Sequence, residues 1–228
     1  MKCYMCDNES MTGEHVPPEC FFPEGHKLNL ITVPACPEHN LKKSKDDEYV
    51  RSIIAPFWGN NSLGQTMATT KVNRSFEHSG GLVAAVFRGV RVVKLKDGTE
   101  TGAVTVDLDR WDTFFNHFAN AIYWNDSKVR HNQSWEIINP SLTVGESVLK
   151  GEPDPYDEVN RKLLSLSFQE VRTPNPEIFR YFFFRHSNES YAYKFQFYEG
   201  FTVCALSKPT GVPAHNTANH DAPVVNKE

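Results

Sequence analysis

Four metal-ligating side chains near the N-terminus constrain this chain more than any other feature. Cys3 and Cys6 form one pair separated by two residues, and Cys36 and His39 form a second pair with the same spacing. Two such pairs at this separation are typical of one tetrahedral zinc site. So short a segment buries little apolar surface by itself, so bound zinc would supply the free energy that folds it. Buried core cysteines are the alternative interpretation, but they do not explain the paired spacing.

Composition limits the class of protein. The chain has 228 residues, of which 39% are hydrophobic and 23% charged, as in globular proteins. This length suits one compact domain or a small module fused to a larger one. No apolar run reaches the roughly 20 residues that span a bilayer, and the N-terminal residues lack the core of a signal peptide. We therefore expect no membrane association, a reducing cytoplasm, and ordinary thiols at Cys20 and Cys204.

The net charge of −4 argues against a general attraction to nucleic acid. Phosphate binding draws its affinity from lysine and arginine, and acidic residues outnumber basic ones in the first 58 residues. Any contact with phosphate must therefore come from a local basic patch.

Residues 1–58 are predicted to form the metal module. An apolar run at 28–33 fits a strand. After Cys36, apolar side chains at 49, 50, 53 and 54 have helical spacing, which predicts a helix that ends before Pro56. Residues 59–80 are polar and contain glycines, so they are predicted to be a linker or a long loop.

Residues 81–206 are predicted to form an α+β accessory domain of unknown role, with antiparallel strands and two helices. A strand at 82–96 would turn at Asp97-Gly98 and pair with 103–108. Asp109 would cap a helix that runs to about Trp124 and carries an aromatic stripe, which we interpret as core rather than as a base-stacking platform. A second helix is expected at 155–166 and a three-stranded meander at 178–185, 191–198 and 201–206. The tail, 207–228, is predicted to be disordered.

Chemically useful residues lie between and after the zinc ligands. Glu14-His15 precedes Val16-Pro17, Asn29 follows His15 by fourteen residues, and Asn40 directly follows His39. This pattern resembles the HNH endonucleases, whose ββα-metal fold is held by a zinc knuckle in many members. The resemblance covers residues 1 to about 55. It departs from the common pattern in that His39 stands where cysteine is more frequent and Asn40 makes a His-Asn-Asn variant.

The resemblance implies a metal-dependent endonuclease that hydrolyses phosphodiester bonds in DNA. His15 would be the general base that takes a proton from water. Glu14 and Asn40 offer the hard oxygen ligands that Mg²⁺ or Mn²⁺ prefers. Asn29 would brace the loop that carries His15. Basic side chains at the start of the helix would contact DNA phosphates; they are Lys42, Lys43 and Lys45.

Several alternatives remain open at this level. His15 could replace His39 as a zinc ligand, and Asn40 could cap the helix. The three lysines could be a solvated face, because Asp46, Asp47 and Glu48 follow them. Asp47 and Glu48 themselves are more often helix-surface acids than metal ligands. Charged residues on the 82–96 strand either extend a nucleic-acid surface or protect a sheet edge; they are Arg88, Arg91, Lys94 and Lys96.

Two functions from different classes follow. One is the nuclease, in bacterial or phage defence, restriction or DNA packaging by family association, with residues 81–206 providing substrate grip, target choice, a protein partner surface or a homodimer contact. The other is a zinc-stabilised module that binds nucleic acid or protein and leaves its nuclease site unused.

Overall fold

The computed structural model describes residues 1–94, 100–142, 157–185, 190–207 and 223–225. Its architecture is mixed α+β, built around a five-stranded antiparallel sheet of order β5-β9-β8-β7-β6. The N-terminal elements are β1 (Thr12–His15), η1 (Glu19–Phe21), β2 (Thr32–Ala35), α1 (Pro37–Asn40), η2 (Leu41–Lys43) and α2 (Ser44–Ile54). The helices that follow are α3 (Ser62–Met67), η3 (Ala68–Val72), α4 (Asn73–His78) and α5 (Gly80–Val86). The other elements are β3 (Arg91–Lys94), β4 (Glu100–Thr105), α6 (Leu108–Ser127), β5 (Trp135–Ile138), α8 (Asp157–Leu164), β6 (Gln169–Val171), β7 (Phe179–Arg185), β8 (Tyr191–Phe197), β9 (Phe201–Ser207) and β10 (Pro223–Val225).

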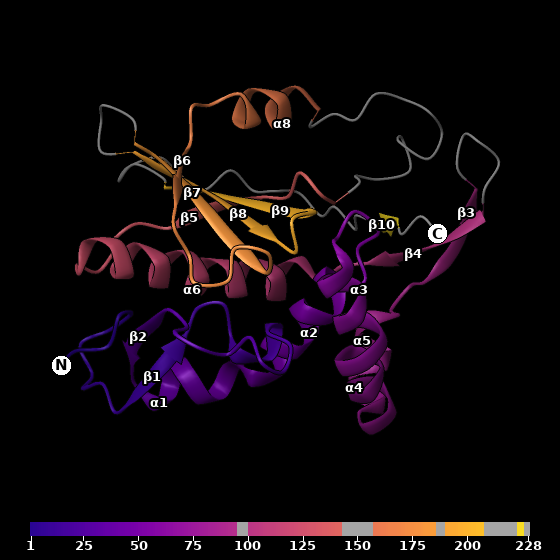
Figure 1. The fold of residues 1–228 in the computed structure, drawn as a ribbon, viewed down its shortest axis with the longest axis horizontal. Coiled ribbons are helices and arrows are strands. Elements are labelled where there is room, and N and C mark those ends of the chain that lie inside the picture. The colour runs from indigo at the N-terminus through magenta and orange to yellow at the C-terminus, as the bar shows by residue number, and fades with distance from the viewer. Residues whose placement is uncertain (95–99, 143–156, 186–189, 208–222, 226–228) are drawn as a thin grey trace.

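Helix α6 lies at the centre of the molecule. The five-stranded sheet packs on one side of it, and β2 and α2 pack on the other (Figure 1). Its predicted aromatic stripe is confirmed as core, because Trp111, Phe115 and Phe118 are buried with their neighbours on the same face. The helix begins two residues earlier than predicted, since Asp107 rather than Asp109 accepts the capping hydrogen bond, from the backbone N–H of Arg110.

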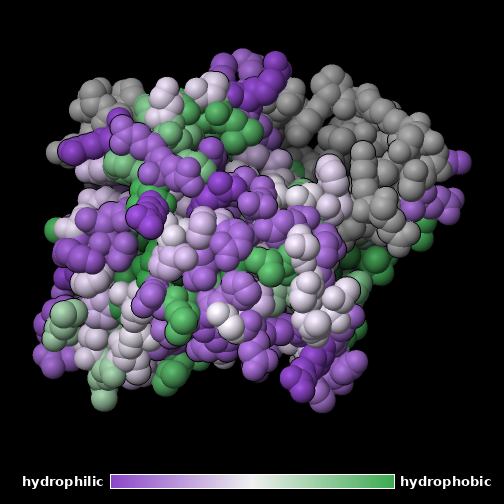
Figure 2. Space-filling model, in the orientation of Figure 1, coloured by the Kyte–Doolittle hydropathy of each residue, from purple (hydrophilic) through white to green (hydrophobic). Residues whose placement is uncertain are grey.

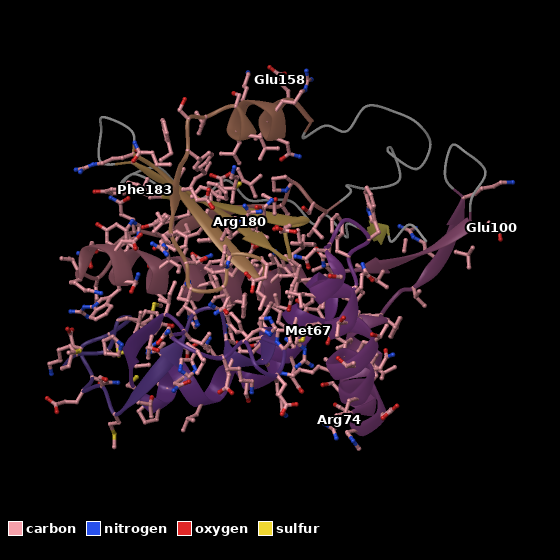
Figure 3. The ribbon with its side chains drawn as sticks, viewed as in Figure 1. Met67, Arg74, Glu100, Glu158, Arg180 and Phe183 are labelled. Carbon is pink, nitrogen blue, oxygen red and sulfur yellow. The ribbon has the colours of Figure 1, made fainter. Side chains whose placement is uncertain are left out.

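One hydrophobic core joins the N-terminal residues to the sheet. The Phe21 ring lies 6.1 Å from Phe114 and 5.5 Å from Phe197. The Tyr198 hydroxyl donates a hydrogen bond of 2.6 Å to the carbonyl of Phe21. The segments predicted as 1–58 and 81–206 therefore fold against each other. Figure 3 shows Met67 in the interior between them, with Arg74 and Glu158 at the outer margins.

The predicted linker at 59–80 is wrong, because most of this segment is helical from Ser62 onward. Two polar residues that resemble loop residues in sequence are helix caps. The Asn61 side chain accepts from the N–H groups of Leu63 and Gly64, and Ser79 accepts from Leu82. Met67 and Val72 are buried, so contacts with the core stabilise helices that look polar in sequence.

Glycine is required where this helical segment meets the sheet. At Gly200, in the turn between β8 and β9, an added Cβ would lie 2.1 Å from the carbonyl oxygen of Gly59. Any larger residue would force the two backbones apart. The contact continues through a hydrogen bond of 2.9 Å from the N–H of Asn61 to the carbonyl of Tyr198.

Two predicted strands need correction. The first half of the strand predicted at 82–96 is helix α5, whose buried Leu82 and Val86 are one helical turn apart, and the described strand is only Arg91–Lys94. The strand predicted at 28–33 is displaced to 32–35, because Asn29 has a left-handed backbone with φ of 57°. The Asp97-Gly98 turn and Lys96 lie outside the described residues.

The remaining expectations are largely met. Helix α2 buries Tyr49, Val50, Ile53 and Ile54 and ends before Pro56. The three-stranded meander is confirmed as β7, β8 and β9, and β5 and β6 extend it to five strands. In the tail predicted to be disordered, Pro223–Val225 pairs with β4. The surface in Figure 2 is mainly hydrophilic, with small scattered hydrophobic groups.

Candidate metal centre and the residues around it

The cysteine and histidine pairs converge on one point. Strand β1 pairs antiparallel with β2, and α1 starts directly after Cys36, so the hairpin places the second pair beside the N-terminal loop that carries the first. The ligand atoms of Cys3, Cys6, Cys36 and His39 all lie within 4.8 Å of one another. Because His15 is not in this group, the alternative in which it replaces His39 is not supported.

The spacing of these atoms fits a tetrahedral metal. His39 Nδ1 lies 3.6 Å from the Sγ of Cys3, 3.6 Å from that of Cys6 and 3.3 Å from that of Cys36. The Sγ atoms of Cys6 and Cys36 are 3.8 Å apart. A tetrahedral zinc with ordinary bond lengths gives about 3.6 Å for the S–N edges and about 3.8 Å for the S–S edges. This Cys₃His cluster could therefore hold zinc.

Local hydrogen bonds favour the thiolate form of Cys36, one of the four residues of the cluster. The backbone N–H of Met5 approaches Cys3 Sγ at 3.4 Å. Burial opposes ionisation of Cys36, but hydrogen bonds from the backbone and side chain of His39 and from the neighbouring cysteines lower the pKa of its thiol to about 6. A thiolate is the form that binds zinc. By contrast, burial raises the pKa of Cys20 and of Cys204 to about 12, as expected for inert thiols.

A second polar cluster lies next to the metal centre and contains Glu14. Its carboxylate is buried and contacts the Lys43 ammonium through Oε1. Lys43 Nζ also lies 3.3 Å from Asp47 Oδ1. The exposed fractions of these side chains are only 4% for Glu14, 13% for Lys43 and 15% for Asp47. Lys43 is therefore an internal ion-pair partner, and its predicted role as a surface phosphate contact is wrong.

Burial dominates the electrostatics of this cluster. It raises the pKa of Glu14 to about 7, although the charge and hydrogen bond of Lys43 oppose the rise. Burial raises the pKa of Asp47 in the same way. One ammonium thus faces two carboxylates that are costly to ionise together. From the sequence, Asp47 was interpreted as a surface acid. Its spacing of four residues from Lys43 is the local pattern that indicates their ion pair.

Stability should depend on pH through Glu14. Since its folded-state pKa of about 7 lies above the ordinary 4.5, the native protein keeps a proton that the unfolded chain releases. The free energy of unfolding should therefore fall as pH rises from 4.5 to 7. Glu14→Gln should reduce that fall, as measured by urea denaturation at pH 5 and pH 7.5 without Mg²⁺ or Mn²⁺. Exposed Glu24→Gln is the matched control, and equal pH dependence in wild type and Glu14→Gln would contradict the expectation.

Asn40 links the start of the helix to the hairpin. Its Nδ2 donates to Thr12 Oγ1 at 2.9 Å and to the carbonyl of Gly13 at 3.2 Å. The side chain makes no capping hydrogen bond to a backbone N–H, so the helix-cap alternative is not supported. Both amide hydrogens are used, and the amide oxygen has no hydrogen-bond partner among the residues that the structure describes.

His15 lies on the other side of β1 from Glu14, as alternation along a strand requires. Its side chain is 39% exposed, and Nδ1 lies 4.0 Å from Glu19 Oε2. Asn29 is exposed and makes no hydrogen bond within the described ranges, so the expected brace between it and the His15 loop is not observed. Lys45 is exposed, and the side chain of Lys42 is outside the described part of the structure.

No protein-family model matches this chain, and neither the curated proteins nor the solved structures contain a match. None of the helices in the described ranges is both long and apolar enough to cross a bilayer.

Proposed function

We propose that this protein is a metal-dependent endonuclease of the HNH type that hydrolyses phosphodiester bonds in DNA, with zinc in a purely structural role. The observation that carries the proposal is the link between Asn40 and β1. Because Asn40 follows zinc ligand His39, the metal centre fixes the side chain that bonds Gly13, directly before Glu14-His15. The last motif residue of the resemblance is thus hydrogen-bonded to the two residues that precede the first motif pair, Glu14-His15.

The oxygen donors of this unit suit a hard divalent cation. The carboxylates of Glu14 and Asp47 and the amide oxygen of Asn40 are the ligand types that Mg²⁺ or Mn²⁺ takes. The Tyr4 hydroxyl is buried without a hydrogen-bond partner among the described residues, and the charge of Glu14 adds to the burial that raises its pKa. A divalent ion bound here would compete with Lys43 for the carboxylates. Because His15 faces the other side of β1 and is its last residue, the ion would neutralise charge on the scissile phosphate only if the substrate crosses the end of this strand.

His15 supplies the base. A half-exposed neutral imidazole can accept a proton from a water that attacks phosphorus. The Glu19 carboxylate, 4.0 Å from Nδ1, stabilises the imidazolium that results. Glu19 therefore takes the supporting role that the resemblance assigned to Asn29.

A second function is favoured by one observation, the Lys43 ammonium on the Glu14 carboxylate. If that ion pair persists in the presence of Mg²⁺ or Mn²⁺, the protein is a zinc-stabilised binding module whose nuclease site is unused. Cleavage of supercoiled plasmid separates the two functions, because only the nuclease converts it to nicked or linear DNA.

Asn40→Ala provides the sharper test. Wild type is expected to nick plasmid with Mg²⁺ or Mn²⁺, and the variant should need more metal for half-maximal cleavage while its zinc content stays unchanged. Asn40→His, which offers an imidazole ligand instead, should keep activity with a shift towards Mn²⁺. Loss of the two hydrogen bonds to β1 should also cost about 1–3 kcal/mol of stability. Metal-titrated cleavage rates decide the matter, and identical metal dependence in wild type and Asn40→Ala would remove Asn40 from the site.

A further inference from the structure

Basic side chains gather around the short turn η1, on the side of β1 that carries His15. Lys27 Nζ lies 2.6 Å from Glu19 Oε1, and Glu19 Oε2 lies 4.0 Å from His15 Nδ1. Lys71, from η3, donates a hydrogen bond of 2.7 Å to the carbonyl of Phe22, which ends the turn. Segments far apart in sequence thus bring two lysines to η1, whose Glu19 carboxylate lies near His15 and is influenced by the charges of both lysines.

A third positive charge lies beneath them. Arg51 on α2 is 4% exposed, and one of its amino groups donates to Ser75 Oγ at 2.6 Å, while Glu48 lies 3.8 Å away. Its Nε is buried and has no hydrogen-bond partner within the described residues. Arg51 is too deeply buried to touch a macromolecule, but its charge contributes to the potential of the surface above it.

These positive charges are gathered at an electrostatic cost. Burial lowers the pKa of Lys71, and the charges of Lys27 and then Arg51 lower it further, while Cys20 and the Glu19 carboxylate oppose this only in part. The chain as a whole carries a net charge of −4, so this basic group is a local departure from an acidic protein. An anion bound at the surface would relieve the repulsion.

The shape of the site indicates the class of anion. The cavity beside the turn, between Val16, Phe22 and Phe179, has a volume of about 10 Å³, too small for a nucleotide. Neither Lys27 nor Lys71 lines this cavity; Lys27 is exposed and Lys71 is half-buried. Such an open arrangement suits the phosphates of a polymer backbone better than an enclosed small molecule.

We propose that Lys27 and Lys71 bind backbone phosphates of the DNA duplex next to the scissile phosphate, which is attacked by the water that His15 deprotonates. This inference rests on the proposed nuclease; it takes the place of the predicted contact at Lys43, while the predicted contacts at Lys42 and Lys45 stay predictions. Glu19 holds Lys27 beside His15 in the free protein, and the exposed ion pair is weak enough to open when phosphate binds.

The test measures DNA binding separately from cleavage. In Lys27→Gln/Lys71→Gln both charges are removed, while glutamine at 71 keeps an N–H donor one bond nearer to the backbone; circular dichroism checks that the variant folds like wild type. Fluorescence anisotropy of a labelled duplex without Mg²⁺ or Mn²⁺ should show that the slope of log affinity against log salt falls by about 2. Lys162→Gln is the matched control. Lys162 also forms an ion pair with a glutamate, with Nζ 2.7 Å from Glu158 Oε1, but it lies on α8 and outside the proposed contact surface. Its slope should equal that of wild type.

The outcomes distinguish this inference from the nuclease itself. An unchanged slope in the double variant, or no binding of DNA by wild type, overturns the proposed contact surface. If the double variant binds DNA as wild type does and wild type cleaves plasmid, the contact surface is refuted and the nuclease proposal still holds. A reduced slope in the double variant, with no cleavage by wild type under any metal, supports the surface and refutes the nuclease.

Discussion

His15→Ala is expected to reduce plasmid cleavage by about 10²–10⁴-fold while zinc content and fold remain unchanged. The large effect follows because the variant loses the only side chain assigned to take a proton from water. The fold should survive, since the His15 side chain is 39% exposed and lies outside the Cys₃His cluster. Initial rates of nicking at saturating metal, with zinc measured by elemental analysis, give the result.

His26→Ala is the matched control for this substitution. Its imidazole belongs to the same N-terminal segment, is 36% exposed and lies 4.0 Å from Glu177, much as His15 lies near Glu19. It should cleave at the wild-type rate. Wild-type activity in His15→Ala would refute its role as base, and loss of zinc from that variant would show that it contributes to the metal centre.

Cys36→Ser is expected to abolish zinc binding and leave the protein insoluble or unfolded. Cys36 connects the end of β2 to α1, and the cluster ties this junction to the loop that contains Cys3 and Cys6. Zinc at such a site contributes on the order of 10–16 kcal/mol of binding free energy, which exceeds the total stability of most domains. Elemental analysis should find one zinc in wild type, and circular dichroism should show loss of structure in the variant.

Cys20→Ser is the control, since Cys20 is outside the cluster and only partly buried. It should keep both zinc and fold. A well-folded wild type that holds no zinc would contradict the assignment of the cluster as a zinc site.

The sequence alone was enough for features that depend on local spacing. Two pairs separated by two residues identified the four side chains that converge in the Cys₃His cluster, because a metal site of this kind needs short chelating segments. Helical periodicity identified the buried face of α2 and the aromatic stripe of α6, because neighbours three and four residues apart share a helix face. Alternation identified the meander β7–β9 in the same way.

The tertiary structure decided which polar side chains are buried and which meet across the chain. Lys43 is placed against Glu14 by the packing of the helix on the hairpin, and no local pattern predicts this pairing between residues 29 positions apart. The helices at 62–86 owe their stability to core contacts that a polar sequence conceals. Lys27 and Lys71 are 44 residues apart in the sequence, yet both bind the turn beside His15. The sequence alone does not reveal such a meeting, because it depends on long-range packing rather than on local spacing.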